Sequence, residues 1–196
     1  HFESCGQQWM LLAEPRYAVA LVNQSSYGHD VSPAGGDEHT PTMGVMARLT
    51  LLRSPQSPDP HPDQGCHHLV YSLLTDARVE SAHVEAARLN QPLQVRSGTV
   101  ELPSTARIEP VHGTAVIDAV KQAFDGSGDL VIRIHEAEGA RSRVRLLLDR
   151  DGCVSEVDLL EDPIDEPTQQ LPASTCSRVE LTLRPFQILT LRVSQR

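Results

Sequence analysis

The sequence lacks the composition typical of several common classes of protein. Aromatic residues make up 4% of its 196 positions, lysine occurs once, at Lys121, and no two of its four cysteines form a CxxC pair. The 17 Lys and Arg residues are outnumbered by 26 Asp and Glu, so the formal charge is −9. A module that binds nucleic acid through phosphate contacts needs a basic face, and a membrane-spanning helix needs about 20 consecutive apolar residues. We therefore expect no nucleic-acid partner and no membrane span.

Motifs of self-contained catalysis are missing as well. The sequence has neither a GxSxG nucleophile elbow nor a GxxxxGK[ST] phosphate loop. Cys5, Cys66, Cys153 and Cys176 are scattered without the spacing of zinc ligands. A chain of this length can bury a core without disulfides, so free thiols and a cytoplasmic location are expected. We predict no catalytic residue and no metal or cofactor site within this chain.

Apolar and polar residues alternate along most of the chain, which is the pattern of β-strands with one face in a core. Turn-forming residues at 125–129 and 149–152 indicate tight connections between neighbouring strands. This regular succession of short strands and turns is typical of an antiparallel β-sandwich. The predicted strands are 16–22, 45–52, 68–74, 130–135, 143–148, 179–183 and 187–193.

One short helix interrupts this all-β pattern. Residues 82–89 have helical spacing, with Val84, Ala87 and Leu89 on the side expected to face the core. Trp9 lies on a predicted strand, where core packing is its expected role. Periodicity fades between residues 96 and 112, so a domain boundary is expected there.

The densest polar stretch is residues 52–68, which hold four prolines, three histidines, two aspartates and one arginine. Proline fixes φ and removes a hydrogen-bond donor, so the stretch is expected to be a stiff loop. Rigid loops on β scaffolds often carry binding residues. A solvated connection is the alternative. A metal site is disfavoured, because adjacent His67 and His68 would point to opposite sides of an extended chain.

An ordered series of short motifs runs through nearly the whole sequence, and together it resembles the C-terminal portion of family 38 α-mannosidases of the cytosolic and bacterial branch. Two motifs depart from that pattern, because residues 24–28 lack a basic residue and residues 135–139 read HEAEG. The matching motifs are Phe2-Glu3 with Trp9 and Glu14, residues 17–23, 27–31, 49–55, 58–59, 63–67, 71–73, 85–87, 89–93, 120–123, 136–139, 158–161 and 185–187.

The resemblance implies a retaining, metal-dependent glycoside hydrolase that acts on α-mannosides. Its aspartate nucleophile and its ligands for a divalent metal, expected to be zinc, would lie in an N-terminal catalytic domain outside these residues. The chain is then the non-catalytic C-terminal part of a longer protein, and the start at His1 is read as a truncation. Residues 1–96 would belong to a larger β-sandwich and residues 107–196 to a smaller terminal one.

In proteins of this family, a loop of the larger sandwich reaches toward the substrate cleft, and residues 53–67 match it best. The resemblance thus implies that this chain buttresses the catalytic domain and lines part of the sugar cleft. The alternative is a stand-alone carbohydrate-binding or interaction module, with Trp9, Tyr27 and His61 as a platform; a homo-oligomer is also left open. The expected substrate-binding residues are Tyr27, Arg53, Asp59, Asp63 and His67.

Overall fold

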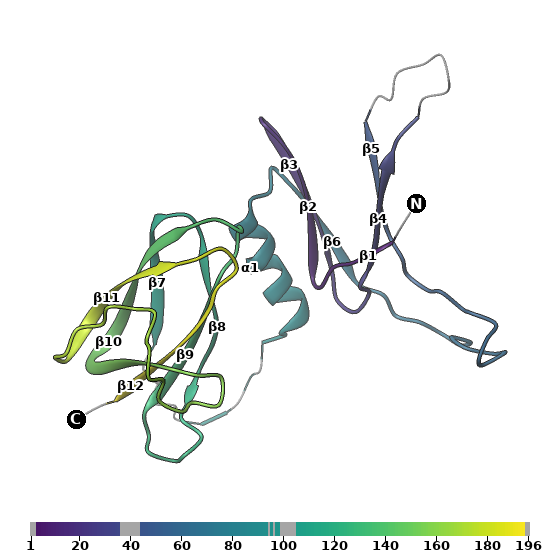
Figure 1. The fold of residues 1–196 in the computed structure, drawn as a ribbon. Helices are drawn as coiled ribbons and strands as arrows, with labels where there is room; N and C mark the ends of the chain where they lie inside the picture. The colour runs from purple at the N-terminus through teal and green to yellow at the C-terminus, as the bar shows by residue number, and fades with distance from the viewer. Residues whose placement is uncertain (1–2, 36–43, 94, 96, 99–104, 195–196) are drawn as a thin grey trace. The chain divides into compact units, whose positions relative to one another are not determined.

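The computed structural model describes residues 3–35, 44–93, 95, 97–98 and 105–194. The chain divides into two compact units, His1–Arg96 (unit 1) and Ser97–Arg196 (unit 2), both drawn in Figure 1. Every strand pair in both units is antiparallel among the residues that the structure describes. The predicted all-β, antiparallel fold class is confirmed.

Unit 1 contains two three-stranded sheets, in the orders β1–β4–β5 and β2–β3–β6. Residues alternate between the two faces of each strand, so the pairing register decides which side chains share a face. Met10 in β2 lies opposite Leu21 in β3, and Leu21 lies opposite Leu73 in β6. The strands are β1 (Ser4–Cys5), β2 (Trp9–Glu14), β3 (Tyr17–Asn23), β4 (Gly28–Pro33), β5 (Val45–Leu49) and β6 (Tyr71–Thr75).

The helix α1 (Val79–Asn90) packs on one face of the β2–β3–β6 sheet. The contact is made through small side chains, because Ala20 of β3 and Ala82 of α1 are both fully buried. Trp9 packs beside this cluster, with its ring edge-on to His83 at a centroid distance of 5.1 Å, so its predicted core role is confirmed. Within the described residues, no helix is long and apolar enough to cross a membrane.

The predicted apolar side of the helix was wrong for Val84 and Ala87, whereas Leu89 is half-buried. Val84 is 46% exposed and Ala87 is also exposed, whereas Ala82 and Ala86 are fully buried. Alanines four residues apart lie on one face of a helix and allow its backbone to approach the sheet closely. The alanines rather than the larger valine form the contact, because small side chains let the helix lie closer to the sheet.

Unit 2 is a six-stranded structure in which the long strand β10 (Ser142–Val157) takes part in two pairings. The first half of β10 pairs with β7 (Ala106–His112) and β11 (Cys176–Leu183), and its second half pairs with β12 (Ile188–Ser194). Strand β9 (Leu130–Glu136) joins β12 to β8 (Ala115–Gln122). Side chains from both halves of β10 therefore reach one core.

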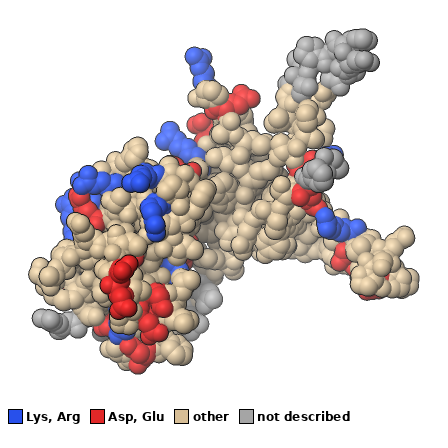
Figure 2. Space-filling view, viewed as in Figure 1, with Lys and Arg blue, Asp and Glu red and all other residues tan. Residues whose placement is uncertain are grey.

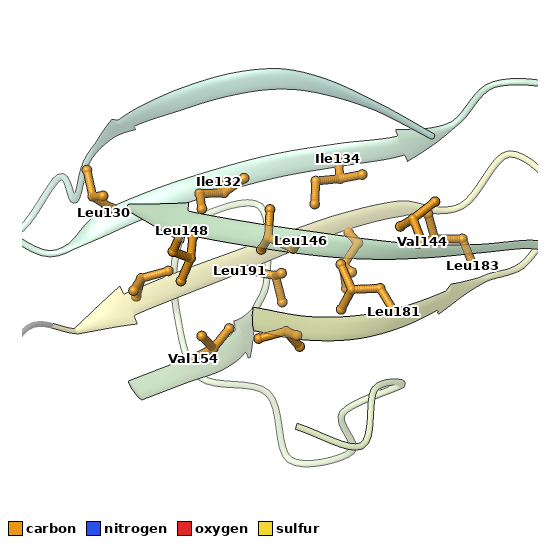
Figure 3. Packing of buried hydrophobic residues seen from close by; sticks show 13 residues of the cluster. Leu130, Ile132, Ile134, Val144, Leu146, Leu148, Val154, Leu181, Leu183 and Leu191 are labelled. Atoms are coloured by element: carbon orange, nitrogen blue, oxygen red, sulfur yellow. The ribbon is translucent and has the colours of Figure 1, made fainter. Parts of the chain in front are cut away.

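The core of unit 2 is a cluster of branched aliphatic side chains between these strands, as Figure 3 shows. Ile132 and Ile134 of β9, Leu146 of β10, Leu181 of β11 and Leu191 of β12 are fully buried within it. Each fully buried side chain of this size stabilises the fold by about 1.5–3 kcal/mol. The alternating pattern that predicted these strands thus marks the residues that fill the core.

The tight connection expected at residues 149–152 is not a chain reversal, because β10 continues through it without a break. The pairing with β11 is irregular between Leu147 and Gly152, as at a β-bulge. Gly152 also lies where a Cβ atom would overlap the side chain of Val193. The turn-like residues therefore mark the place where β10 changes partners.

The turn expected at residues 125–129 does join β8 to β9.

Candidate functional site

Residues 50–70 connect β5 to β6 without forming a helix or strand, and we call them the β5–β6 loop. Four of the five predicted substrate-binding residues, Arg53, Asp59, Asp63 and His67, lie in this loop. Tyr27 lies just before β4, in a different part of unit 1. All five residues are exposed. The loop's prolines restrict φ, so the backbone can keep a defined shape without a strand partner.

Hydrogen bonds inside the β5–β6 loop hold three of the predicted residues. Asp63 Oδ2 accepts a hydrogen bond from the Ser54 N–H at 3.1 Å, and the Asp63 carbonyl lies 2.7 Å from Nε2 of His67. Asp59 Oδ1 accepts from the His61 N–H at 2.8 Å. Asp63 has a φ of 56°, a left-handed conformation that Asp tolerates better than most residues. These three residues therefore shape the loop.

Arg53 and Tyr27 instead meet at a hollow of about 400 Å³ in unit 1. Segments far apart in the sequence form this hollow: strand β1, the residues before β4, and the start of the β5–β6 loop. Asp59, Asp63 and His67 are not among the residues that line it. The lining residues are Glu3, Ser4, Cys5, Ser25, Ser26, Tyr27, Gly28, Thr50, Leu51, Leu52 and Arg53.

Glu3 is the central polar residue of this hollow, and the predicted site residues did not include it. The carboxylate forms an ion pair with Arg53, whose side chain is 72% exposed while that of Glu3 is 24% exposed. Hydrogen bonds from the Thr50 hydroxyl and the Arg53 guanidinium hold the pKa of Glu3 below its ordinary value. A Cβ atom on Gly28 would overlap the Glu3 carboxylate, so a larger residue there would displace the Glu3 side chain from its present position. In the sequence, the motif Phe2-Glu3 was the signal that could have pointed to Glu3 as a site residue.

The hollow offers hydrogen-bonding groups of several kinds at one place. Tyr27 is 47% exposed and brings a phenol, and Ser25, Ser26 and Thr50 bring aliphatic hydroxyls. The exposed guanidinium of Arg53 retains donors beyond its contact with Glu3. Hydroxyls, a guanidinium and one aromatic ring are suited to a polar ligand rich in hydroxyl groups. The arrangement can bind such a ligand at its surface.

The metal-site interpretation of the β5–β6 loop gains no support from the geometry. Across residues 3–35, 44–93, 95, 97–98 and 105–194, no group of three or more His, Cys, Asp or Glu side chains is placed to hold a metal ion. His61 and His67 make hydrogen bonds inside the loop, to Gln64 and to the Asp63 carbonyl. All four cysteines are free thiols, as predicted.

A second hollow, of about 830 Å³, lies in unit 2 beneath the proline-rich connection between β10 and β11. The charged groups that line it already have partners within unit 2. Arg192 Nε donates to Asp129 Oδ2 at 2.7 Å, and Glu161 forms an ion pair with Lys121. The hollow that contains Arg53 and Tyr27 is therefore the better candidate for a binding site.

Two family models match separate stretches of the chain. Residues 1–61 match the family model described as "Glycosyl hydrolases family 38 C-terminal domain". Residues 114–191 match the model described as "Glycosyl hydrolases family 38 C-terminal beta sandwich domain". Both models describe C-terminal regions of glycosyl hydrolases, and the antiparallel strands of both units fit that class.

The curated relatives are α-mannosidases. The chain is 33% identical to human "Alpha-mannosidase 2C1" over 97% of its own length and 18% of that protein. It is 32% identical to "Alpha-mannosidase G" of Dictyostelium discoideum over 70% of its length and 12% of that protein. It is 25% identical to "Alpha-mannosidase" of Saccharomyces cerevisiae over 98% of its length and 19% of that protein.

These matches identify the chain as a C-terminal β-sandwich region of a glycosyl hydrolase. It belongs to family 38, and it spans less than a fifth of the length of these relatives. The family resemblance carried by the motif series is confirmed.

Proposed function

We propose that this chain is the non-catalytic C-terminal region of an α-mannosidase, a retaining glycosidase that acts on α-mannosides. The similarity to α-mannosidases over almost the whole chain supports this proposal. The nucleophile and a divalent metal, for which zinc is the expected ion, are assigned to the N-terminal catalytic domain of the full-length protein. We further propose a cytoplasmic location, because cytosolic family members share the motif series.

The role proposed for unit 1 is to buttress that catalytic domain and to line part of the sugar cleft. The observation that carries the proposal is the hollow in which Tyr27 and Arg53 meet Glu3, at the root of the β5–β6 loop. Arg53 and Tyr27 are proposed to contact the α-mannoside. Asp59, Asp63 and His67 are proposed to give the loop the shape that this contact needs.

Kinetics of the full-length protein with an aryl α-mannoside test this role. Arg53→Ala removes a charged donor to the sugar, and such a hydrogen bond is worth about 1.5–3 kcal/mol, or about 10–100-fold in kcat/KM. The matched control is Arg48→Ala, because Arg48 also forms an exposed ion pair, with Asp30 at 2.8 Å, but does not line the hollow. Each variant is expected to change the free energy of unfolding by less than about 1 kcal/mol. Equal losses of kcat/KM in both variants would contradict the proposed contact.

A further inference from the structure

The side chain of Glu3 is held in place at the end of the β1–β4–β5 sheet. Glu3 directly precedes β1, in which Cys5 pairs with Gly28 at the start of β4. Thr50 directly follows β5, and its N–H donates to the Gly28 carbonyl at 2.8 Å. The Thr50 hydroxyl donates to the Glu3 carboxylate, which lies in the space that a side chain on Gly28 would fill. Three segments of unit 1 thus fix the position of this carboxylate.

Arg53 owes its orientation to this carboxylate. Its side chain is 72% exposed, and a long exposed side chain samples many rotamers unless a partner holds it. The contact with Glu3 uses the terminal nitrogen Nη2, whereas a guanidinium has five N–H donors in one rigid plane. In Figure 2, acidic and basic side chains lie side by side at the root of the β5–β6 loop. The ion pair therefore orients the guanidinium and leaves donors for a ligand.

The ion pair also makes the hollow neutral overall. Among the described residues that line the hollow, Glu3 and Arg53 are the charged ones, and their charges are opposite. The pKa of Glu3 is held below its ordinary value by hydrogen bonds from Thr50 and Arg53, so its negative charge is present at neutral pH. An arginine without a carboxylate partner binds phosphate and other oxyanions strongly. The pairing with Glu3 therefore favours neutral hydroxyl groups over anions.

We propose that Glu3 is a positioning and specificity-determining residue, which orients Arg53 and balances its charge so that the hollow accepts a neutral sugar and rejects an anionic one. The inference rests on the proposed function in one respect, namely that Arg53 contacts the α-mannoside. Glu3 acts through Arg53. Gly28 contributes by leaving room for the carboxylate.

Inhibition of the full-length protein by sulfate tests the charge balance. Glu3→Gln keeps the shape of the side chain but removes its charge, so Arg53 is left with an unbalanced positive charge. Sulfate, added at constant ionic strength, should then compete with an aryl α-mannoside with an inhibition constant at least about fivefold lower than for the natural protein. Adding Arg53→Ala to Glu3→Gln should abolish this gain.

The matched control for the sulfate experiment is Asp30→Asn. Asp30 is the carboxylate partner of the exposed Arg48, at 2.8 Å, and neither residue lines the hollow. Removing its charge should leave the inhibition constant for sulfate unchanged. A general increase in positive charge would lower this constant equally in both variants, and that result would overturn the proposal.

Kinetics without sulfate test the positioning role. Glu3→Ala should lower kcat/KM for an aryl α-mannoside by about 3–10-fold, because Arg53 must then be ordered when the ligand binds. The double variant Glu3→Ala/Arg53→Ala should be no slower than Arg53→Ala alone, since Glu3 acts through Arg53. Glu3→Gln keeps an oxygen that accepts from the guanidinium, so it should retain most of kcat/KM for this neutral substrate. Additive losses accompanied by a lower Tm would show a purely structural role for Glu3.

The same variants separate this inference from the proposed function. Natural kcat/KM in Arg53→Ala would overturn the proposed contact with the sugar, and the role of Glu3 with it. A loss of kcat/KM in Arg53→Ala, combined with natural kinetics in Glu3→Ala and unchanged sulfate inhibition in Glu3→Gln, would overturn only the role of Glu3. A gain in sulfate inhibition that persists after removal of Arg53 would likewise overturn it.

Discussion

At the scale of single residues, the feature with the clearest physical consequence is the buried carboxylate of Glu136. It is fully buried at the end of β9 and accepts hydrogen bonds from the backbone N–H groups of residues 138–140 at 2.8–3.3 Å. The Phe186 N–H donates to it at 2.9 Å and the Ser142 hydroxyl at 3.1 Å. The one carboxylate thus joins the turn after β9 to the turn between β11 and β12.

Glu136→Gln should reduce the free energy of unfolding at neutral pH by about 2–3 kcal/mol, because a buried charge-assisted network loses its charge. Burial acts to raise the pKa of Glu136, but the backbone donors outweigh it and hold this pKa below the ordinary value of 4.5. The carboxylate therefore stabilises the fold fully above about pH 4.5, and its contribution disappears as the pH falls through the folded-state pKa. Urea unfolding as a function of pH measures both effects.

The control for this experiment is Glu138→Gln, because Glu138 is exposed and lies two residues away. It should change stability by less than about 1 kcal/mol. A stability difference between the natural protein and Glu136→Gln that stayed constant down to acid pH would contradict the role given to the ionised carboxylate.

At the scale of secondary-structure elements, the free edge of β11 is protected by a side chain that imitates a strand. Gln169 Oε1 accepts the Thr182 N–H at 3.1 Å, and Gln169 Nε2 donates to the Thr182 carbonyl at 3.0 Å. Glu156 fixes this segment by accepting from the N–H groups of Thr168 and Gln169 at 2.7 and 2.9 Å. The amide thus occupies the two backbone groups of Thr182 that an added strand would use.

Gln169→Ala should expose the edge of β11 and increase self-association, because unpaired strand edges recruit other strands. Two partly buried hydrogen bonds are lost, so the free energy of unfolding should fall by about 1–3 kcal/mol. Concentration-dependent light scattering measures the association. Gln170→Ala is the matched control, since Gln170 is exposed and adjacent in sequence. Unchanged scattering for Gln169→Ala would show that the amide does not protect the edge.

The β5–β6 loop supports a second prediction at this scale. Asp63→Ala removes the acceptor of the Ser54 N–H, next to Arg53, so the full-length protein should lose kcat/KM for an aryl α-mannoside by about as much as Arg53→Ala does. Its stability should change little, because the loop is exposed. Asp63→Asn keeps an acceptor oxygen and should restore much of the activity. Loss of stability in proportion to activity would show that Asp63 has a purely structural role.

How much of the fold and of the candidate site could be predicted depends on how far apart in the sequence the interacting residues lie. Alternation within one segment located strand β9 and the other core strands of unit 2, because burial acts on neighbouring residues of the same strand. The contacts of Glu136 with Phe186 and of Arg53 with Glu3 each span 50 residues of sequence, so no local pattern reveals them. Residues 149–152 look like a turn locally, and only the change of partner strands explains why β10 continues.

At the scale of the whole molecule, the two units differ in how much of their apolar surface they bury. Unit 2 encloses its own core, whereas unit 1 leaves Leu73 and Tyr71 exposed to solvent. If unit 1 and the catalytic domain each form one wall of the sugar cleft, both walls are needed to hold a sugar in the right orientation. The hollow with Arg53 and Tyr27 is therefore expected to act only together with the catalytic domain.

The purified 196-residue chain is accordingly expected to show no turnover of an aryl α-mannoside and no millimolar binding of mannose by calorimetry. The physical reason is that one exposed wall offers few of the hydrogen bonds and little of the burial that a ligand site supplies. The full-length protein, assayed in parallel, is the positive control for activity. Mannose binding by the isolated chain at millimolar or lower concentration would favour a stand-alone carbohydrate-binding module. If Tyr27→Ala then abolished that binding, the hollow would be the sugar site in its own right, and unit 1 would not need the catalytic domain to recognise mannose.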